Sequence, residues 1–283
     1  MYLGLFLAVC WFLSAEETVA PTYLYRHIPK IQEQATGVTS PTCHYRPIFG
    51  EGDSETRIVR GVSRFGEVTV DPGGTCELVN YPREEEIYLM LEGKGVLHYG
   101  GAEHRVRKHD YMYLAPGVSH GIANDADVPI RFLVFGYRLP KDLTVAPTEG
   151  LQLANLDEVP LQTVGGHPPD CQYRLLMGNT ESKRDRLASA HILTSLFVME
   201  FTPGGTNFPH HHEREEEIYF LLSGEGEMVA GGGLTGVEGR HPAKAGDAYF
   251  FRLNCTAGFY ATKIQSSEKA RILAARSLFP GMK

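Results

Sequence analysis

Two histidines and one glutamate in the second half of the chain have the spacing of metal ligands. His210 and His212 are two residues apart, and Glu217 follows five residues later, at the start of the apolar run 218–222. Successive side chains of a β-strand point to opposite faces, so a strand here would present both imidazoles on one face. Two imidazole nitrogens and a carboxylate suit a divalent first-row metal such as Mn, Fe, Ni, Cu or Zn, and they leave positions open for water, dioxygen or substrate.

The glutamate belongs to a six-residue sequence that occurs twice in the chain. Residues 83–88 and 214–219 both read Arg-Glu-Glu-Glu-Ile-Tyr, and the glycines on either side of the two copies also match. Such self-similarity is typical of an internal duplication. We therefore expect two structurally equivalent halves.

The two copies differ at the positions that would bind metal. Glu86 of the first copy corresponds to Glu217 of the second. Val79 and Tyr81, however, stand where the second copy has its two histidines. The first copy therefore lacks the imidazole pair.

A second motif differs between the copies in the opposite sense. Residues 110–121 predict a strand and a proline–glycine turn that presents His120. The corresponding residue of the second copy is Ala257. The first copy therefore has a histidine at this position that the second copy lacks.

On these two motifs the chain resembles the cupin family. The first cupin motif runs from a glycine through His-x-His and a glutamate to a second glycine, and the second copy matches it from Gly204 to Gly224. The second cupin motif is matched in the first copy by Gly117, His120 and Asn124. Over roughly residues 55–280 the chain resembles a bicupin, which implies an all-β fold of two tandem cupin barrels, each a double-stranded β-helix of the jelly-roll type.

For the second copy, the resemblance implies a metal site. We expect His210, His212 and Glu217 to bind one divalent transition metal, with water or substrate in place of the family histidine that is absent at Ala257. The alternative is that the metal was lost with that histidine. The two imidazoles would then be polar lining of a barrel cavity.

The resemblance implies a different interior for the first barrel. Tyr81, Glu86 and His120 should converge there, but two ligands and a phenol make a poor site for a divalent ion. We expect a hydrogen-bonded Glu–His pair that lines an empty or ligand-binding cavity.

An arginine is a further candidate at the mouth of the second barrel. Arg252 replaces the proline of the second motif. Its planar guanidinium is suited to a substrate carboxylate, and a structural pair with Glu216 or Glu217 is the alternative.

The repeat also divides the chain into segments. We expect a signal peptide at 1–15 and an arm at 16–55, followed by a first cupin domain at 56–139. A linker with the arm of the second copy at 140–170 then leads to a second cupin domain at 171–283. The first segment carries no charged side chain and is too short to cross a bilayer as a helix, which takes about 20 residues. A cleaved secretory signal would make the protein secreted or periplasmic. If the segment instead packs on a barrel, the protein would be cytoplasmic.

Composition narrows the range of partners. The formal net charge of −7 argues against nucleic acid and against an anionic membrane surface. A small molecule is therefore the expected ligand. Cupin arms commonly pack on a neighbouring barrel or subunit, which leaves a homo-oligomer open. Without Cys10, disulfides and buried free thiols remain alternatives for four cysteines, namely Cys43, Cys76, Cys171 and Cys255.

Two classes of function fit these features. The favoured one is a metal-dependent enzyme that acts on a small oxygenated metabolite, with dioxygenase, decarboxylase, isomerase and hydrolase activities all implied by the resemblance. The alternative is a non-catalytic cupin that binds a small ligand or sugar, or is structural. Both share the fold, so the decision between them depends on the site.

Overall fold

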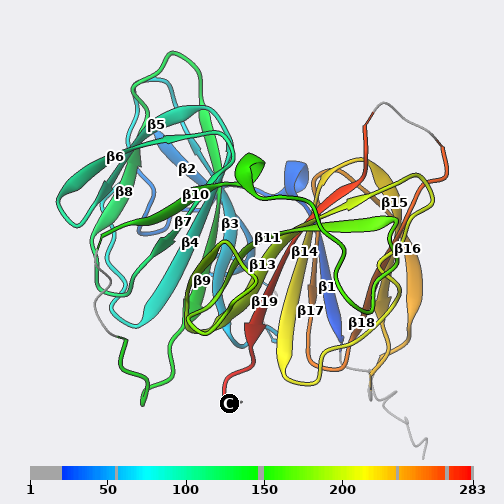
Figure 1. Ribbon diagram of the computed structural model, residues 1–283. Coiled ribbons are helices and arrows are strands. Elements are labelled where there is room, and N and C mark those ends of the chain that lie inside the picture. Colours follow the sequence, from blue (N-terminus) through cyan, green and yellow to red (C-terminus); the bar gives the residue numbers. More distant parts are fainter. Residues whose placement is uncertain (1–20, 55–56, 146–149, 234–235, 265–267, 282–283) are drawn as a thin grey trace, which may run out of the picture.

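The protein consists of two β-barrels that lie side by side (Figure 1). The computed structural model describes residues 21–281 apart from 55–56, 146–149, 234–235 and 265–267. The predicted signal peptide at 1–15 lies outside this part of the chain. Within the described residues the helices are two short 3₁₀ turns, η1 (Ile28–Lys30) and η2 (Leu156–Glu158), and no helix there is long and apolar enough to cross a membrane.

The first barrel is built from a six-stranded and a three-stranded sheet. The strand orders are β10-β7-β4-β9-β3-β2 and β6-β5-β8. The bounds are β2 (Cys43–Gly50), β3 (Val62–Val70), β4 (Glu84–Glu92), β5 (Lys94–Tyr99), β6 (Ala102–Arg107), β7 (Asp110–Leu114), β8 (His120–Ala123), β9 (Ile130–Arg138) and β10 (Gln152–Asn155).

The second barrel repeats this plan with a seven-stranded and a three-stranded sheet. The orders are β1-β17-β14-β19-β13-β11-β12 and β16-β15-β18. The bounds are β1 (Tyr23–His27), β11 (Cys171–Asn179), β12 (Leu187–Ala190), β13 (Leu193–Phe201), β14 (Glu215–Ser223), β15 (Glu225–Gly231), β16 (Gly239–Lys244), β17 (Asp247–Phe251), β18 (Thr256–Ala261) and β19 (Arg271–Leu278). The prediction of an all-β chain with two tandem barrels is confirmed.

The repeated glutamates occupy equivalent places in the two barrels. Glu86 lies on β4, which pairs with β7 and β9, and Glu217 lies on β14, which pairs with β17 and β19. Both strands are buried on two faces, because one face of each lines its own barrel and the other packs against the opposite barrel. Strand alternation therefore sends Glu86 into the barrel interior and its neighbour Glu85 toward the other barrel.

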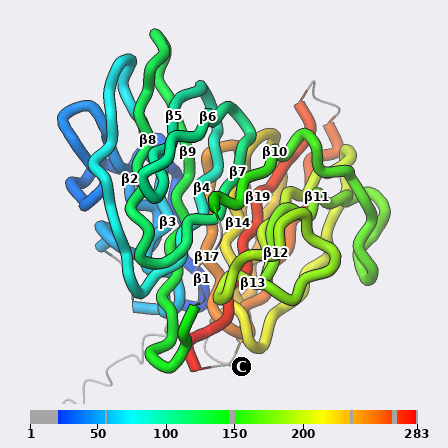
Figure 2. The backbone as a smooth tube through the Cα atoms, turned by 60° about the vertical axis from the view of Figure 1, so that its left-hand side comes forward, coloured from blue at the N-terminus to red at the C-terminus, as the bar shows by residue number. Residues whose placement is uncertain are grey.

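The two barrels exchange their arms. Strand β1, which precedes the first barrel in sequence, pairs with β17 of the second barrel, and β10 of the linker pairs with β7 of the first (Figure 2). A buried carboxylate anchors each arm: Asp247 contacts His27 Nδ1 at 2.7 Å, and Asp110 accepts from Asn155 Nδ2 at 2.8 Å. The arm predicted at 16–55 thus contains one strand for each barrel, since β2 belongs to the first.

Two glutamates also join the barrels reciprocally. Glu85, fully buried, accepts the backbone N–H groups of residues 191–193 at 2.7–2.9 Å. Glu216 accepts those of Arg60 and Gly61 at 3.0 and 2.7 Å. The middle glutamate of the repeated sequence is therefore explained by the contact between barrels and not by the interior.

An apolar core fills the space between these contacts. Phe65 and Phe135 of the first barrel pack with Phe220 and Phe250 of the second in one continuous cluster. Full burial of such a side chain contributes about 1.5–3 kcal/mol, so this interface stabilises the pair of barrels as one unit. Cys43 and Cys76 form a disulfide inside the first barrel, whereas Cys171 and Cys255 are buried free thiols.

Candidate metal centre

Three side chains converge inside the second barrel. One ligand atom each of His210, His212 and Glu217 lies within 4.8 Å of the other two. Glu217 comes from β14, and both histidines come from the loop before it, where the backbone of His210 pairs with that of Ala257 on β18. The structure thus brings together the three residues that the spacing predicted as ligands.

The loop before β14 fixes the first imidazole. His210 Nδ1 lies 2.8 Å from the carbonyl oxygen of Phe208, and since a carbonyl only accepts, Nδ1 carries the proton. The lone pair is then on Nε2, the atom available to a metal. The loop itself is held by buried Asn207, whose amide donates to Tyr219 Oη and accepts from the Phe259 N–H.

Two of the three groups are orphaned. His212 Nε2 and Glu217 Oε2 are buried, lie 3.5 Å apart and have no hydrogen-bond partner among the described residues. An unpaired buried polar atom costs about 1–3 kcal/mol. Such a cost is offset when a cation binds between the groups, so the residues present fit a divalent transition metal.

The protonation states also suit metal binding. Burial lowers the pKa of His210, which favours the neutral imidazole. Burial opposes ionisation of Glu217, but the nearby His212 and Arg276 outweigh it and hold the pKa of this carboxyl below its usual range. A neutral imidazole and an ionised carboxylate are the forms that bind metal.

A small cavity of about 70 Å³ lies against the three groups. A water molecule takes about 30 Å³ of liquid volume, so the cavity holds only a small ligand. Its walls include residues that the motifs did not indicate, namely His167 of the linker, Tyr173 of β11, Arg184 between β11 and β12, and Arg276 of β19. Arg252, the predicted carboxylate ligand, is not among the described residues that line it.

Sequence held a weak signal for one of these residues. His167 follows two glycines and precedes two prolines, which predicts a rigidly presented side chain. Nothing comparable marks Arg276, since an arginine near the end of a strand is common. It is identified only when β19 is seen to pair with β14 beside Glu217.

The corresponding place in the first barrel is filled by an arginine. Arg64 is buried, its guanidinium donates to Glu86 Oε1 at 2.5 Å, and it stacks 3.7 Å from the ring of Tyr81. His120 Nε2 contacts the other oxygen of Glu86 at 2.6 Å. Tyr81, Glu86 and His120 therefore do meet in the interior, around a cation that the sequence did not suggest.

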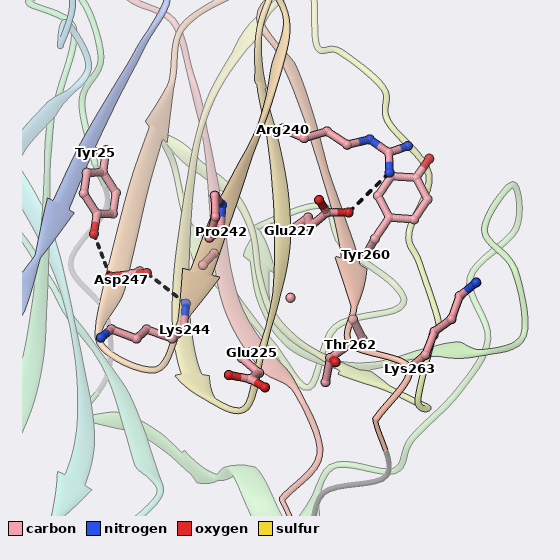
Figure 3. Close-up of a pocket in the computed structure, with 14 residues that line it drawn as sticks. Tyr25, Glu225, Glu227, Arg240, Pro242, Lys244, Asp247, Tyr260, Thr262 and Lys263 are labelled. Carbon is pink, nitrogen blue, oxygen red and sulfur yellow. Dashed lines mark hydrogen bonds and ion pairs between the residues drawn. The ribbon is translucent and has the colours of Figure 1, made fainter.

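One further hollow lies on the outside of the second barrel, over β15, β16 and β18 (Figure 3). Its volume is about 850 Å³, and two pairs of its lining side chains contact each other: Arg240 forms an ion pair with Glu227, and Tyr25 donates a hydrogen bond to Asp247. None of the three converging groups lines it. The converging groups border the smaller cavity instead.

The chain belongs to the cupin family. The cupin domain model matches residues 66–136 and 197–274, which together make more than half of the chain, so the protein is a bicupin. An oxalate-binding protein from Thermotoga maritima is 32% identical over 69 residues, 24% of this chain and 57% of that protein. The chain spans less than two thirds of the length of the curated relatives it matches.

Solved structures share the two-barrel fold. Protein Ylba from E. coli aligns with a TM-score of 0.67 at 14% identity, over 95% of this chain and 97% of that one. An oxalate decarboxylase from Lactobacillus farciminis aligns with a TM-score of 0.64 at 15% identity, over 92% and 87%. At this level of identity the likeness establishes the fold alone.

Proposed function

We propose that the second barrel holds one divalent transition metal and that this centre acts on a small carboxylate. The observation that carries the proposal is the orphaned pair His212 Nε2 and Glu217 Oε2, which together with His210 borders a cavity of about 70 Å³. The fit of these residues to a metal favours an occupied centre over two imidazoles left as polar lining.

Arginines on the cavity wall support a carboxylate as the ligand. Arg276 lies 3.7 Å from Glu215, so its charge is only loosely paired, and its Nε is buried without a hydrogen-bond partner within the described structure. Arg184 also reaches the cavity and is held by Ser195 at 2.9 Å. A guanidinium matches the planar geometry of a carboxylate. The names of the relatives, an oxalate-binding protein and an oxalate decarboxylase, point to the same class of ligand.

In this mechanism the protein supplies orientation and charge. When bound, the metal would polarise a substrate oxygen or activate a bound water. His210, His212 and Glu217 would hold it, while Arg276 neutralises and orients the carboxylate. The apolar side chains of Leu175, Phe197 and Met199 restrict the cavity to small molecules and exclude bulk water.

Consumption of small carboxylates by metal-loaded protein tests this proposal. The purified chain is loaded with Mn²⁺, Fe²⁺, Co²⁺, Ni²⁺, Cu²⁺ or Zn²⁺ in turn, mixed with oxalate and short 2-oxo and 2-hydroxy acids, and followed by NMR. We expect turnover of at least one acid by wild type and none by His212→Ala. Binding without turnover would favour the non-catalytic ligand-binding cupin. If wild type neither binds nor consumes any of these acids, the proposal is contradicted.

A further inference from the structure

The second barrel has lost the histidine of the second motif at Ala257, but it receives another imidazole from the linker. His167 lines the same cavity as His210, His212 and Glu217. Its ring centre lies 5.5 Å from that of His210, with the two planes at 75°. It comes from the segment before β11 and not from any strand of the cupin motifs.

The backbone at His167 is held firmly. Its N–H donates to the carbonyl of Val164 at 3.1 Å, which closes a turn, and Gly166 inside the turn has a φ of +86° that side chains disfavour. Pro168 follows and restricts His167 to extended backbone. The position of the ring is therefore set by the turn and the proline together.

The ring of His167 is oriented in the same way as that of His210. Its Nδ1 lies 2.9 Å from the carbonyl oxygen of Asn207, so Nδ1 carries the proton and the lone pair is on Nε2. Tyr173 packs beside it, with ring centres 5.2 Å apart. Neighbouring carbonyls, those of Asn207 and Phe208, thus fix two imidazoles that border one cavity.

Distances decide what this imidazole can contact. Ligand atoms about 2.0–2.2 Å from an ion lie at most about 4.4 Å from each other. Among the described residues the group that meets a 4.8 Å limit consists of His210, His212 and Glu217, without His167. His167 therefore lies outside the group that would hold an ion, and its side chain lines the cavity beside that group.

We infer that His167 and Arg276 together form the carboxylate-binding wall of this centre, with His167 contacting the bound molecule and not the metal. The inference rests on the proposed function. Arg276 contributes the buried Nε that lacks a partner in the described part of the chain, and His167 contributes an imidazole fixed by Asn207. The preferred ligand is a small carboxylate with a second oxygen on the next carbon, which can reach both the ion and this wall.

Two separate readouts test the role of His167. Metal per chain is measured by mass spectrometry, and the affinity of the Co²⁺-loaded protein for oxalate and acetate is measured by calorimetry together with the visible absorption of Co²⁺. We expect His167→Ala to retain one metal per chain and to bind oxalate about tenfold more weakly, the size expected for one lost hydrogen bond to a charged group. His211→Ala, which removes an exposed neighbouring imidazole, should match wild type in both.

Each other result has a definite meaning. Loss of metal from His167→Ala would make His167 a ligand and would overturn the inference, as would unchanged oxalate affinity. Loaded wild type that binds neither oxalate nor acetate would overturn it as well. If wild type binds no metal, the proposed function is refuted instead. This result is obtained before any variant is made, so the two failures are distinguishable.

Discussion

The two barrels place the same carboxylate in the same position and neutralise it in different ways. In the first barrel Glu86 is paired with Arg64 and His120 and has no need of an external cation. In the second, Glu217 faces two imidazoles, and its Oε2 has no hydrogen-bond partner in the described structure. A duplicated carboxylate can thus be neutralised by an internal guanidinium in one copy, while in the other it faces two imidazoles that fit the proposed metal.

Backbone space accounts for the strand on which the first barrel carries its arginine. Arg64 pairs across the sheet with Gly136, and a Cβ there would lie 2.8 Å from Arg64 Cγ. The equivalent pair of the second barrel is Ser195 and Arg276, so the arginine is on the opposite strand. From there its guanidinium lies 3.7 Å from Glu215 and acts on Glu217 through its charge, while the imidazole of His212 lies 3.5 Å from the Glu217 carboxylate.

The backbone pair that joins the two motifs also differs between the barrels. Val79 pairs with His120 in the first barrel, and His210 pairs with Ala257 in the second. Each barrel has thus kept one histidine of this pair, on opposite strands. A single histidine beside an arginine suffices for a closed interior, whereas a metal needs the pair of imidazoles.

The largest expected effect is on metal content. Replacing His210 or His212 by alanine leaves two protein ligands, too few to compete with water, so the variants should lose the metal. His120→Ala is the matched change in the first barrel and should leave the metal content of the protein as in wild type. Retention by His212→Ala, or loss in His120→Ala, would show that the metal is not where the comparison puts it.

The next effect concerns the stability of the first barrel. Arg64→Met leaves Glu86 buried beside His120 alone, and removal of one partner from a buried ion pair costs about 3–5 kcal/mol. We expect the free energy of unfolding in urea to fall by that amount. Adding Glu86→Gln should restore most of it, because the unpaired charge is then gone. A loss below about 1 kcal/mol for Arg64→Met would mean that the guanidinium does not stabilise the closed interior.

A smaller effect depends on pH and concerns the contact between barrels. Burial raises the pKa of Glu216 to about 7, although the amides of Gly61 and Arg60 oppose the shift. A carboxyl whose folded pKa is raised stabilises the protein below its unfolded pKa, here 4.5, and this contribution is lost as pH rises toward 7. Relative to Glu216→Gln, wild type should therefore lose up to about 3 kcal/mol over that window.

Urea unfolding at pH 4.5, 6 and 7.5 measures this difference. The same measurement on Glu85→Gln, the matched change on the other barrel, shows how much stability is lost when an inter-barrel hydrogen bond alone is changed. A difference between wild type and Glu216→Gln that stays constant with pH would contradict the prediction.

Sequence alone predicted the fold and the converging ligands, because both depend on patterns that strand alternation and duplication make visible. The repeated Glu-Glu-Glu did not reveal that Glu85 and Glu216 join the barrels, because the apolar run after it indicates a strand buried on both faces but not which backbone groups lie against the glutamates. The lining of the cavity depends on residues far apart in sequence, such as His167 and Arg276, and on the register that brings them together. Arg252 occupies the position of the motif proline directly after β17, and that position does not line this cavity.

We propose that the second barrel binds a metal ion and that the first does not. The most direct test is the number of metal ions per chain after purified wild type has been saturated with Mn²⁺ or Co²⁺ and dialysed. We expect one ion per chain in wild type, and still one ion per chain in His120→Ala, in which Arg64 of the first barrel is intact. Two ions per chain, or none with any divalent ion supplied, would contradict it.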